Sequence, residues 1–450
     1  MNIDQKWFEH ERYPGIGWYS LNLQNDFRQN TEEGKDVGQY EELVNAVAKL
    51  PAGPVREDCA DVLFKAMLEA PVKEGYPYLE PSDLEGIREA RPKNRKDFPS
   101  VKANDELKEK IYGAWLGRIC GCLLGKPVEG LNSKIIKKII EAAGETTLTK
   151  YFDPTPETIK ELELAEDRCW LRYVDGMPMD DDTNYTTLAA VWILKKYGRD
   201  FKPVNVVDSW LESMPKTAYC TAEQAAFLNA AIGIVPPKSA IFRNPFREWI
   251  GAQIRADYYG YINPGDTQMA AEMAWRDATV SHVKNGIYGE MFVAAMLAAA
   301  AVSNDIKEVV RAGLQEIPEK SRLTEAIEKV LSWYEGGRSA EECLTEIHTM
   351  YDEANGYDWC HTIPNAMIVT ACLLYGGMDY EKSICMAVET GFDTDCNGAT
   401  VGSILGMMLG AKNIPEYWIK PLNNTVHTSI DGYETVKITD LVEITLSHLN

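Results

Sequence analysis

The sequence is poor in the residues that build several common functional sites. It has only six histidines, and none of its ten cysteines forms a C-x-x-C pair or a cysteine–histidine spacing typical of zinc sites. A Walker phosphate loop, a G-x-S-x-G elbow and an H-E-x-x-H helix are also missing. These absences exclude the commonest zinc, nucleotide-phosphate and serine-hydrolase motifs. Because most cysteines lie in apolar, helix-like segments, we expect them to be reduced core residues.

Long apolar runs and positive charge are also scarce. The longest apolar run, at 290–302, is shorter than the roughly 20 residues of a membrane span, and the first residues have neither a basic start nor an apolar run. With 46 basic against 68 acidic residues, the formal net charge is −22, which disfavours nucleic acid and anionic membranes as partners. We expect a cytoplasmic protein without a nucleic-acid or membrane partner. The sequence sets no oligomeric state.

The chain divides into two unequal parts. Residues 1–105 are rich in aromatic and charged residues and end in "ARPKNRKDFPSV", a polar, proline-punctuated linker, so we expect an N-terminal extension of unknown role. Residues 106–450 form the main domain. Its apolar residues recur at spacings of three and four, which predicts a compact, all-α, multi-helix bundle, with "YETVKITDLVEITL" at 433–446 as a local exception. The helices are expected at 107–125, 134–143, 184–197, 221–232, 266–280, 287–302, 305–314, 322–334, 340–354, 363–375, 380–390 and 397–410.

Two segments carry glycine at every fourth position. "GAWLGRICGCLLGKPVEG" has glycine at 113, 117, 121 and 125, and "NGATVGSILGMMLG" has glycine at 398, 402, 406 and 410. Each such glycine costs a helix about 1 kcal/mol relative to alanine. Positions four apart share one helix face, however, so each row leaves a stripe without side chains. The rows predict unusually close helix contacts, which either serve core packing alone or also bring the ends of the helices together.

Acidic residues stand at those ends. Glu129 follows the first glycine row, and "GFDTDCN", with Asp393 and Asp395, leads into the second. A third cluster places three consecutive aspartates, 180–182, at the expected start of a helix. One aspartate there is an ordinary helix cap. Three exceed what capping needs, although an acidic cap with solvated neighbours remains an alternative.

The segment "DTDCNG" permits two further interpretations. Asp393, Asp395, Asn397 and Gly398 match the first half of a calcium-binding EF-hand loop, but Ile404 stands where the loop requires glutamate. A phosphatase-type D-x-D nucleophile would follow a β-strand, whereas the preceding "EKSICMAVETG" is helical in period. Neither interpretation accounts for the glycine-rich helix that follows.

Five motifs follow one another along the main domain. They are "GxxxGxxLGKPVEG", an acid-acid-threonine helix start at 180–183, "SHVKNGIYGEMFVAAML", "HTIPNAMIVTACLLYGG" and "GFDTDCNGATVGSILGMMLG". Together and in this order they resemble the ADP-ribosylglycohydrolase family, which includes the dinitrogenase reductase-activating glycohydrolases. The resemblance covers about residues 108 to 412. Residues 1–105 have no counterpart in it.

The resemblance implies an all-α fold with two divalent cations, Mg²⁺ in the first place and Mn²⁺ as the alternative. It also implies hydrolysis at the anomeric carbon of an ADP-ribosyl or other ribosyl substrate. The catalytic residues implied are Glu129, Asp182 and Asp395. The metal ligands implied are Asp180, Asp181, Asp182, Asp393, Asp395 and Cys396.

Two of these positions depart from the family pattern. Asp180 stands where the family commonly has threonine, which keeps an oxygen ligand and adds a negative charge. Cys396 stands where a threonine or serine is usual, and a thiol is a poor ligand for a hard cation such as Mg²⁺. Together with the N-terminal extension, these departures indicate a divergent subgroup.

The physical chemistry of the acidic residues agrees with a metal site. Six converging carboxylates would repel one another and raise each other's pKa values, and two divalent cations would remove most of that repulsion. Oxygen ligands favour magnesium, manganese or calcium over zinc. We expect water to attack the anomeric carbon, with Glu129 in acid/base catalysis. A hydrolase of nucleosides or simpler ribosyl compounds, and a metal-dependent binding protein without catalysis, remain alternatives.

Overall fold

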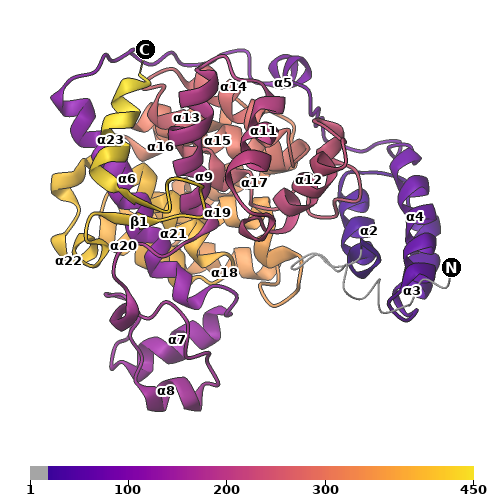
Figure 1. The fold of residues 1–450 in the computed structure, drawn as a ribbon, viewed down its shortest axis with the longest axis horizontal. Helices are drawn as coiled ribbons and strands as arrows, with labels where there is room; N and C mark the ends of the chain where they lie inside the picture. Colours follow the sequence, from indigo (N-terminus) through magenta and orange to yellow (C-terminus); the bar gives the residue numbers. More distant parts are fainter. Residues whose placement is uncertain (1–18, 450) are drawn as a thin grey trace.

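The computed structural model describes residues 19–449, which are helical almost throughout (Figure 1). Within these residues the only sheet is a two-stranded antiparallel hairpin of β1 (Thr425–His427) and β2 (Thr435–Lys437). The all-α class predicted from the sequence is confirmed. No helix in this part of the chain has both the length and the apolar content that crossing a bilayer requires.

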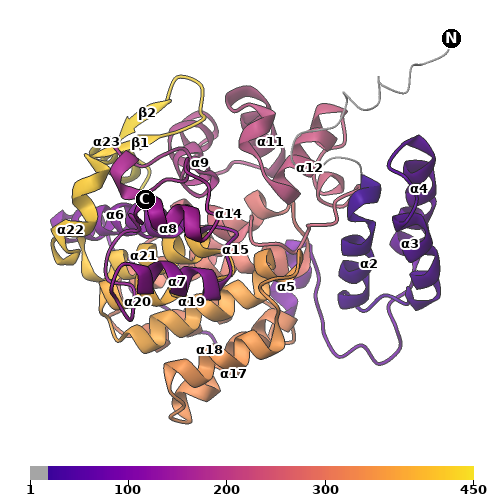
Figure 2. The same cartoon turned by 90° about the horizontal axis from the view of Figure 1, so that it is seen from below.

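The N-terminal region forms a small group of helices beside the main body (Figures 1 and 2). Its own apolar core is separate from that of the rest of the chain and contains Tyr19, Leu23, Val37, Val44, Ala60, Leu63, Phe64 and Met67. The helices of this group are α2 (Leu23–Glu32), α3 (Glu41–Ala48) and α4 (Pro54–Glu69), whereas α5 (Leu84–Ala90) packs against the main body, to whose core Ile87 belongs. Whether residues 1–105 constitute a domain of their own stays a prediction.

The main body packs its helices around one large apolar core. Its first half contains α6 (Asp105–Gly125), α7 (Ser133–Ala142), α8 (Pro156–Glu161), α9 (Asp181–Leu188), α10 (Lys195–Tyr197), α11 (Pro203–Ser213), α12 (Thr221–Ala231), α13 (Asp257–Tyr261) and α14 (Thr267–Ala278). Its second half contains α15 (Lys284–Ala300), α16 (Ile306–Leu314), α17 (Arg322–Glu335), α18 (Ala340–Met350), α19 (Thr362–Gly376), α20 (Tyr380–Glu389), α21 (Thr394–Leu409), α22 (Glu416–Ile419) and α23 (Ile438–Ser447).

All twelve segments predicted as helices are helical, with small differences at their ends. The segment predicted at 184–197 is not a uniform α-helix, because residues Ala189–Leu194 form a π-helical insertion between α9 and α10. The expected exception at 433–446 is a strand for three residues only and continues as α23. The sequence pattern missed the short helices α8, α13 and α22 and the longer α11, which opens with a proline that suits a first helical turn but resembles a breaker.

The two glycine rows pack directly against each other. Helices α6 and α21 lie antiparallel, and a Cβ atom added at Gly117 would stand 2.0 Å from the carbonyl oxygen of Gly402. The reciprocal addition at Gly402 would stand 2.1 Å from the carbonyl oxygen of Gly117. Gly113 faces Gly406 and Gly121 faces Gly398 in the same way. The helix backbones therefore touch along the whole crossing, and no side chain larger than hydrogen fits between them.

Candidate active site

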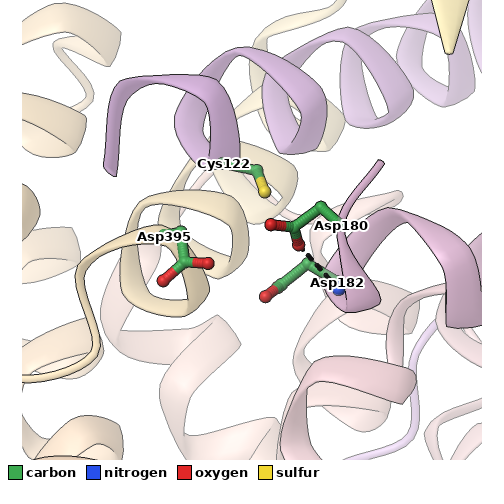
Figure 3. Close-up of side chains that lie close together, drawn as sticks. All are labelled: Cys122, Asp180, Asp182 and Asp395. Carbon is green, nitrogen blue, oxygen red and sulfur yellow. Dashed lines mark hydrogen bonds between the residues drawn. The ribbon is translucent and has the colours of Figure 1, made fainter. Parts of the chain in front are cut away.

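The carboxylates predicted from distant segments meet at one end of this crossing (Figure 3). Asp180 caps the start of α9, Asp182 lies in the first turn of α9, and Asp395 lies in the first turn of α21. One ligand atom from each of them, together with the sulfur of Cys122 on α6, lies within 4.8 Å of the others. All four residues are buried. The end of the glycine crossing thus holds three carboxylates and a thiol in coordination range.

A second group shares Asp395 with the first. Ligand atoms of Asp393, Asp395 and Cys396 also lie within 4.8 Å of one another. The turn that presents them is fixed by Asn365 of α19, whose side-chain oxygen accepts hydrogen bonds from the backbone amide of Asp393 (3.2 Å) and from the Asn397 side chain (2.7 Å). Helix α21 begins directly after Asp393, so the segment is not an EF-hand loop.

Two basic side chains, one on α6 and one directly after its end, enter the same cluster. The Arg118 guanidinium is completely buried and contacts Asp182 at 3.0 Å and Asp257 at 2.9 Å. Lys126 Nζ lies 2.6 Å from Asp180 Oδ2. Arg118 and Cys122 are four residues apart, so they share one face of α6 beside the face that carries the glycines, and Lys126 follows four residues later, directly after the helix ends. The glycine face of α6 therefore packs on α21, and the neighbouring face contacts the carboxylates.

A cavity of about 420 Å³ opens beside the carboxylates. Glu129, Asp181, Asp393, Asp395 and Cys396 line one side of it. The remaining lining residues are Thr217, Tyr219, Cys220, Thr221, Glu223, Gln224, Phe246, Ile250, Gly251, Ile254, Trp359 and Cys360. A cavity of this size accommodates a small organic ligand. Asp182 is absent from the lining, since its carboxylate contacts Arg118 and the Cys396 thiol, which donates to it at 3.2 Å.

The crowding of carboxylates perturbs their protonation. Burial and the neighbouring Asp180 raise the pKa of Asp395 to about 6. The charge of Asp395, followed by burial, raises the pKa of Glu129 well above its usual range. Glu129 nevertheless reaches solvent at the cavity. A carboxyl group whose raised pKa favours its protonated form and which faces a cavity has the properties of a general acid.

The site fits divalent cations. Asp395 Oδ1 is buried and has no hydrogen-bond partner among the described residues, although Asp395 belongs to both ligand groups. A buried carboxylate oxygen without a partner is costly, and a cation would satisfy it. The donor set is dominated by carboxylate oxygens, as Mg²⁺ and Mn²⁺ prefer, while the two sulfurs are softer than these ions favour.

Asp181 provides a test of this electrostatic strain. Burial and the adjacent Asp180 raise the pKa of Asp181 from 3.8 to about 8, so the folded protein holds the proton more tightly than the unfolded chain does. Asp181 therefore destabilises the metal-free fold increasingly as pH rises through this interval. We expect Asp181→Asn to flatten the fall in Tm between about pH 5 and pH 8 in EDTA. The surface variant Asp440→Asn is the control, and equal slopes in all three proteins would contradict the assignment.

All the site residues predicted from the sequence lie close together, but they have two different kinds of surroundings. Asp180, Asp182, Asp393, Asp395 and Cys396 fall into the two ligand groups, whereas Glu129 and Asp181 line the cavity outside them. The residues that the sequence pattern missed are Arg118, Cys122, Lys126, Glu223, Trp359 and Asn365. The four-residue spacing of Arg118, Cys122 and Lys126 was the available signal, but the glycine row beside these residues has the same period.

Comparisons with known proteins identify the family. The family model described as ADP-ribosylglycohydrolase matches residues 103–447, and the chain belongs to that family of hydrolases. A protein of Archaeoglobus fulgidus, described as an uncharacterized protein, is 24% identical over 325 residues, which are 71% of this chain and 93% of that protein. A solved structure described as an ADP-ribosylglycohydrolase-related protein complex covers 77% of this chain and 98% of its own, with 18% identity and a TM-score of 0.47.

Proposed function

We propose that this protein is a metal-dependent glycoside hydrolase that cleaves the N- or O-glycosidic bond at the ribose anomeric carbon of an ADP-ribosylated protein or small molecule. The observation that carries the proposal is the meeting of two carboxylate groups with Glu129 at one cavity. Family membership supports the reaction class. The two cations and the individual roles of the residues are part of the proposal.

Two cations, Mg²⁺ or Mn²⁺, would be held by the two groups that share Asp395. The first group is Asp180, Asp182 and Asp395, and the second is Asp393, Asp395 and Cys396, with Asp181 facing the cavity beside them. When bound, the cations would supply positive charge for ribose hydroxyls and lower the pKa of a nucleophilic water. Arg118 holds the Asp182 carboxylate from behind, so Asp182 supports the site without touching substrate.

The proton transfers are assigned to cavity carboxylates. The bond from the anomeric carbon to the leaving nitrogen or oxygen breaks through an oxocarbenium-like state, and Glu129 donates its proton to the leaving atom. The oxygen of a water molecule forms the new bond to the anomeric carbon. Asp395, which also lines the cavity, accepts the proton that this water loses.

The charge of the cavity favours a second candidate, a hydrolase of nucleosides or simpler ribosyl compounds. Five lining residues are acidic, namely Glu129, Asp181, Glu223, Asp393 and Asp395, and in the part of the chain that the structure describes no lysine or arginine lines the cavity. Phosphate recognition commonly uses arginine or lysine. The aromatic rings of Tyr219, Phe246 and Trp359 would suit a base or another planar leaving group.

The deciding experiment is a hydrolysis panel with ADP-ribosyl-arginine, ADP-ribosyl-serine, a 1″-linked ADP-ribose derivative and several nucleosides. We expect turnover with Mg²⁺ or Mn²⁺ and its loss in EDTA. Asp395→Asn should abolish turnover and weaken Mn²⁺ binding by at least about tenfold, since losing even a group that supports a metal ligand costs about 10- to 100-fold. Asp440→Asn is the matched surface control.

The panel separates the candidates. Metal-dependent release of ADP-ribose supports the first function, and cleavage of nucleosides alone supports the second. Tight Mn²⁺ binding without turnover of any compound would indicate a binding protein that lacks catalysis. Unchanged Mn²⁺ stoichiometry in Asp395→Asn would contradict the metal assignment itself.

A further inference from the structure

Two chain segments together build one wall of the cavity. Residues 246–251 contribute Phe246, Ile250 and Gly251, and residues 357–361 contribute Trp359 and Cys360. The segments pair like short strands, since the backbone amide of Ile250 donates to the Cys360 carbonyl at 2.8 Å. Their register sets where the aromatic side chains stand in the cavity.

The residues of these segments that point away from the cavity meet helix α2 of the N-terminal region. Arg247 is 5% exposed, and the carboxylates that pair with it among the described residues, Asp26 and Glu33, both belong to the α2 region. The Arg247 Nη1 to Asp26 Oδ1 distance is 2.5 Å, and the Nε to Glu33 Oε1 distance is 2.8 Å. Without α2, a buried cation directly beside Phe246 would lose its counter-charges.

The second segment, residues 357–361, also contacts α2 on the side away from the cavity. The Tyr357 hydroxyl lies 3.0 Å from both Gln29 Oε1 and Glu32 Oε2 of α2. Arg28 stacks on the Tyr357 ring at 4.2 Å and pairs with the Asp358 carboxylate. Tyr357 and Asp358 immediately precede the cavity residue Trp359. Both segments of the wall are thus held from behind by one helix.

Glu248 and His361 complete the contact. Gln29 Nε2 donates to Glu248 Oε2 at 2.7 Å, and His361 Nε2 lies 3.7 Å from Glu32 Oε2. Although Glu32, Glu248 and His361 lie close enough to hold a metal, His361 Nδ1 accepts a hydrogen bond from the Ile363 amide at 3.2 Å. Neutral His361 therefore carries its proton on Nε2, which cannot then ligate a metal. The cluster is a polar seam between α2 and the wall.

We propose that α2 is a positioning element of the substrate cavity, with Gln29 and Arg28 as positioning residues that act through Glu248, Tyr357 and Asp358. This role for the N-terminal region rests on the proposed function only in identifying the cavity as the substrate site. It requires the buried polar face of α2 and no contact between α2 and the substrate. Binding of substrate, rather than the chemical step, depends on it.

The test is Gln29→Glu, which places a second carboxylate against Glu248. Like charges that replace a hydrogen bond in a buried seam should displace the wall and raise KM by about tenfold or more, with kcat and Mn²⁺ affinity changed by less than about threefold. Amide hydrogen exchange should accelerate in peptides covering 246–251 and 357–361. Gln24→Glu makes the same substitution on the exposed face of α2, where Gln24 bonds Asn45 at 3.0 Å. This control should change neither KM nor the hydrogen exchange of the two peptides.

A second variant and the hydrogen-exchange measurement distinguish a positioning role of α2 from a general folding role. Gln29→Leu removes the hydrogen bonds without adding charge and should give a smaller effect in the same direction. Equal exchange in Gln29→Glu and Gln24→Glu would overturn the proposal, and so would parallel losses of kcat, metal binding and Tm, which would indicate a general folding role. If no panel compound is hydrolysed, the proposed function fails, while the exchange comparison still tests α2.

Discussion

Gly117→Ala is expected to destabilise the protein by at least about 3 kcal/mol, near the upper end for single core substitutions. The added methyl group would lie 2.0 Å from the Gly402 carbonyl oxygen, which belongs to a helix backbone and cannot rotate away. The two helices would have to separate along the whole crossing. Urea unfolding in the presence of Mn²⁺ measures the loss.

The control for this substitution is Gly356→Ala. Gly356 has an ordinary negative φ and no atom within 4 Å of the position that a Cβ would take, so alanine should be neutral there. Because separation of the helices also moves Asp395 away from Asp180, Gly117→Ala should weaken Mn²⁺ binding as well. Stability and metal affinity equal to those of Gly356→Ala would contradict the close crossing.

Glu129→Gln is expected to lower kcat by about a thousandfold, within the range of 10²- to 10⁴-fold that general acid catalysis contributes. Glutamine keeps the size and polarity of the side chain but cannot transfer the proton. Mn²⁺ affinity should stay within about threefold of the parent, because Glu129 lies outside both ligand groups. The measurement is turnover of the best panel compound, with metal affinity determined on the same preparations.

The exposed residue Glu141 on α7 provides the matched control, since Glu141→Gln removes one charge far from the carboxylate cluster. Equal losses of turnover and metal affinity in Glu129→Gln would make Glu129 a ligand rather than the acid. A rate that recovers for substrates with better leaving groups would support proton donation, because such groups need less protonation.

The sequence predicted the main body well because its signals are local. Helices such as α16 and α17 show apolar periodicity that a single segment reveals, and the glycine rows predict a close crossing through their spacing alone. The N-terminal helices were not predicted, and for α2 the reason is that most of the residues it buries are polar. Helix α2 buries Asp26, Gln29 and Asn30, whose polar side chains suggest surface positions in the sequence. Their burial is explained only by the tertiary structure, in which Arg247 pairs with Asp26 and Glu248 accepts a hydrogen bond from Gln29.

The candidate site was likewise predictable where its signals are local in the sequence and unpredictable where they depend on tertiary contacts. The aspartates were found from clusters within the sequence, but their different surroundings were not. Asp181 faces the cavity while Asp182, one residue later on α9, is held by Arg118 from another helix. A rotation of about 100° between consecutive helical residues explains this separation. Which aspartate faces which way depends on the tertiary position of α9, and no local pattern encodes it.

The crossing of α6 and α21 also determines when α6 can pack during synthesis of the chain. The hydroxyl of Thr394 donates a hydrogen bond to the Gly125 carbonyl, although the two residues are 269 positions apart in the sequence. A nascent chain that has completed α6 must therefore wait for nearly the whole protein before that helix meets its partner, and contacts of such long range slow folding. Products that terminate before residue 394 would expose the bare glycine face of α6 and would lack Asp395, so neither of the two ligand groups could assemble in them.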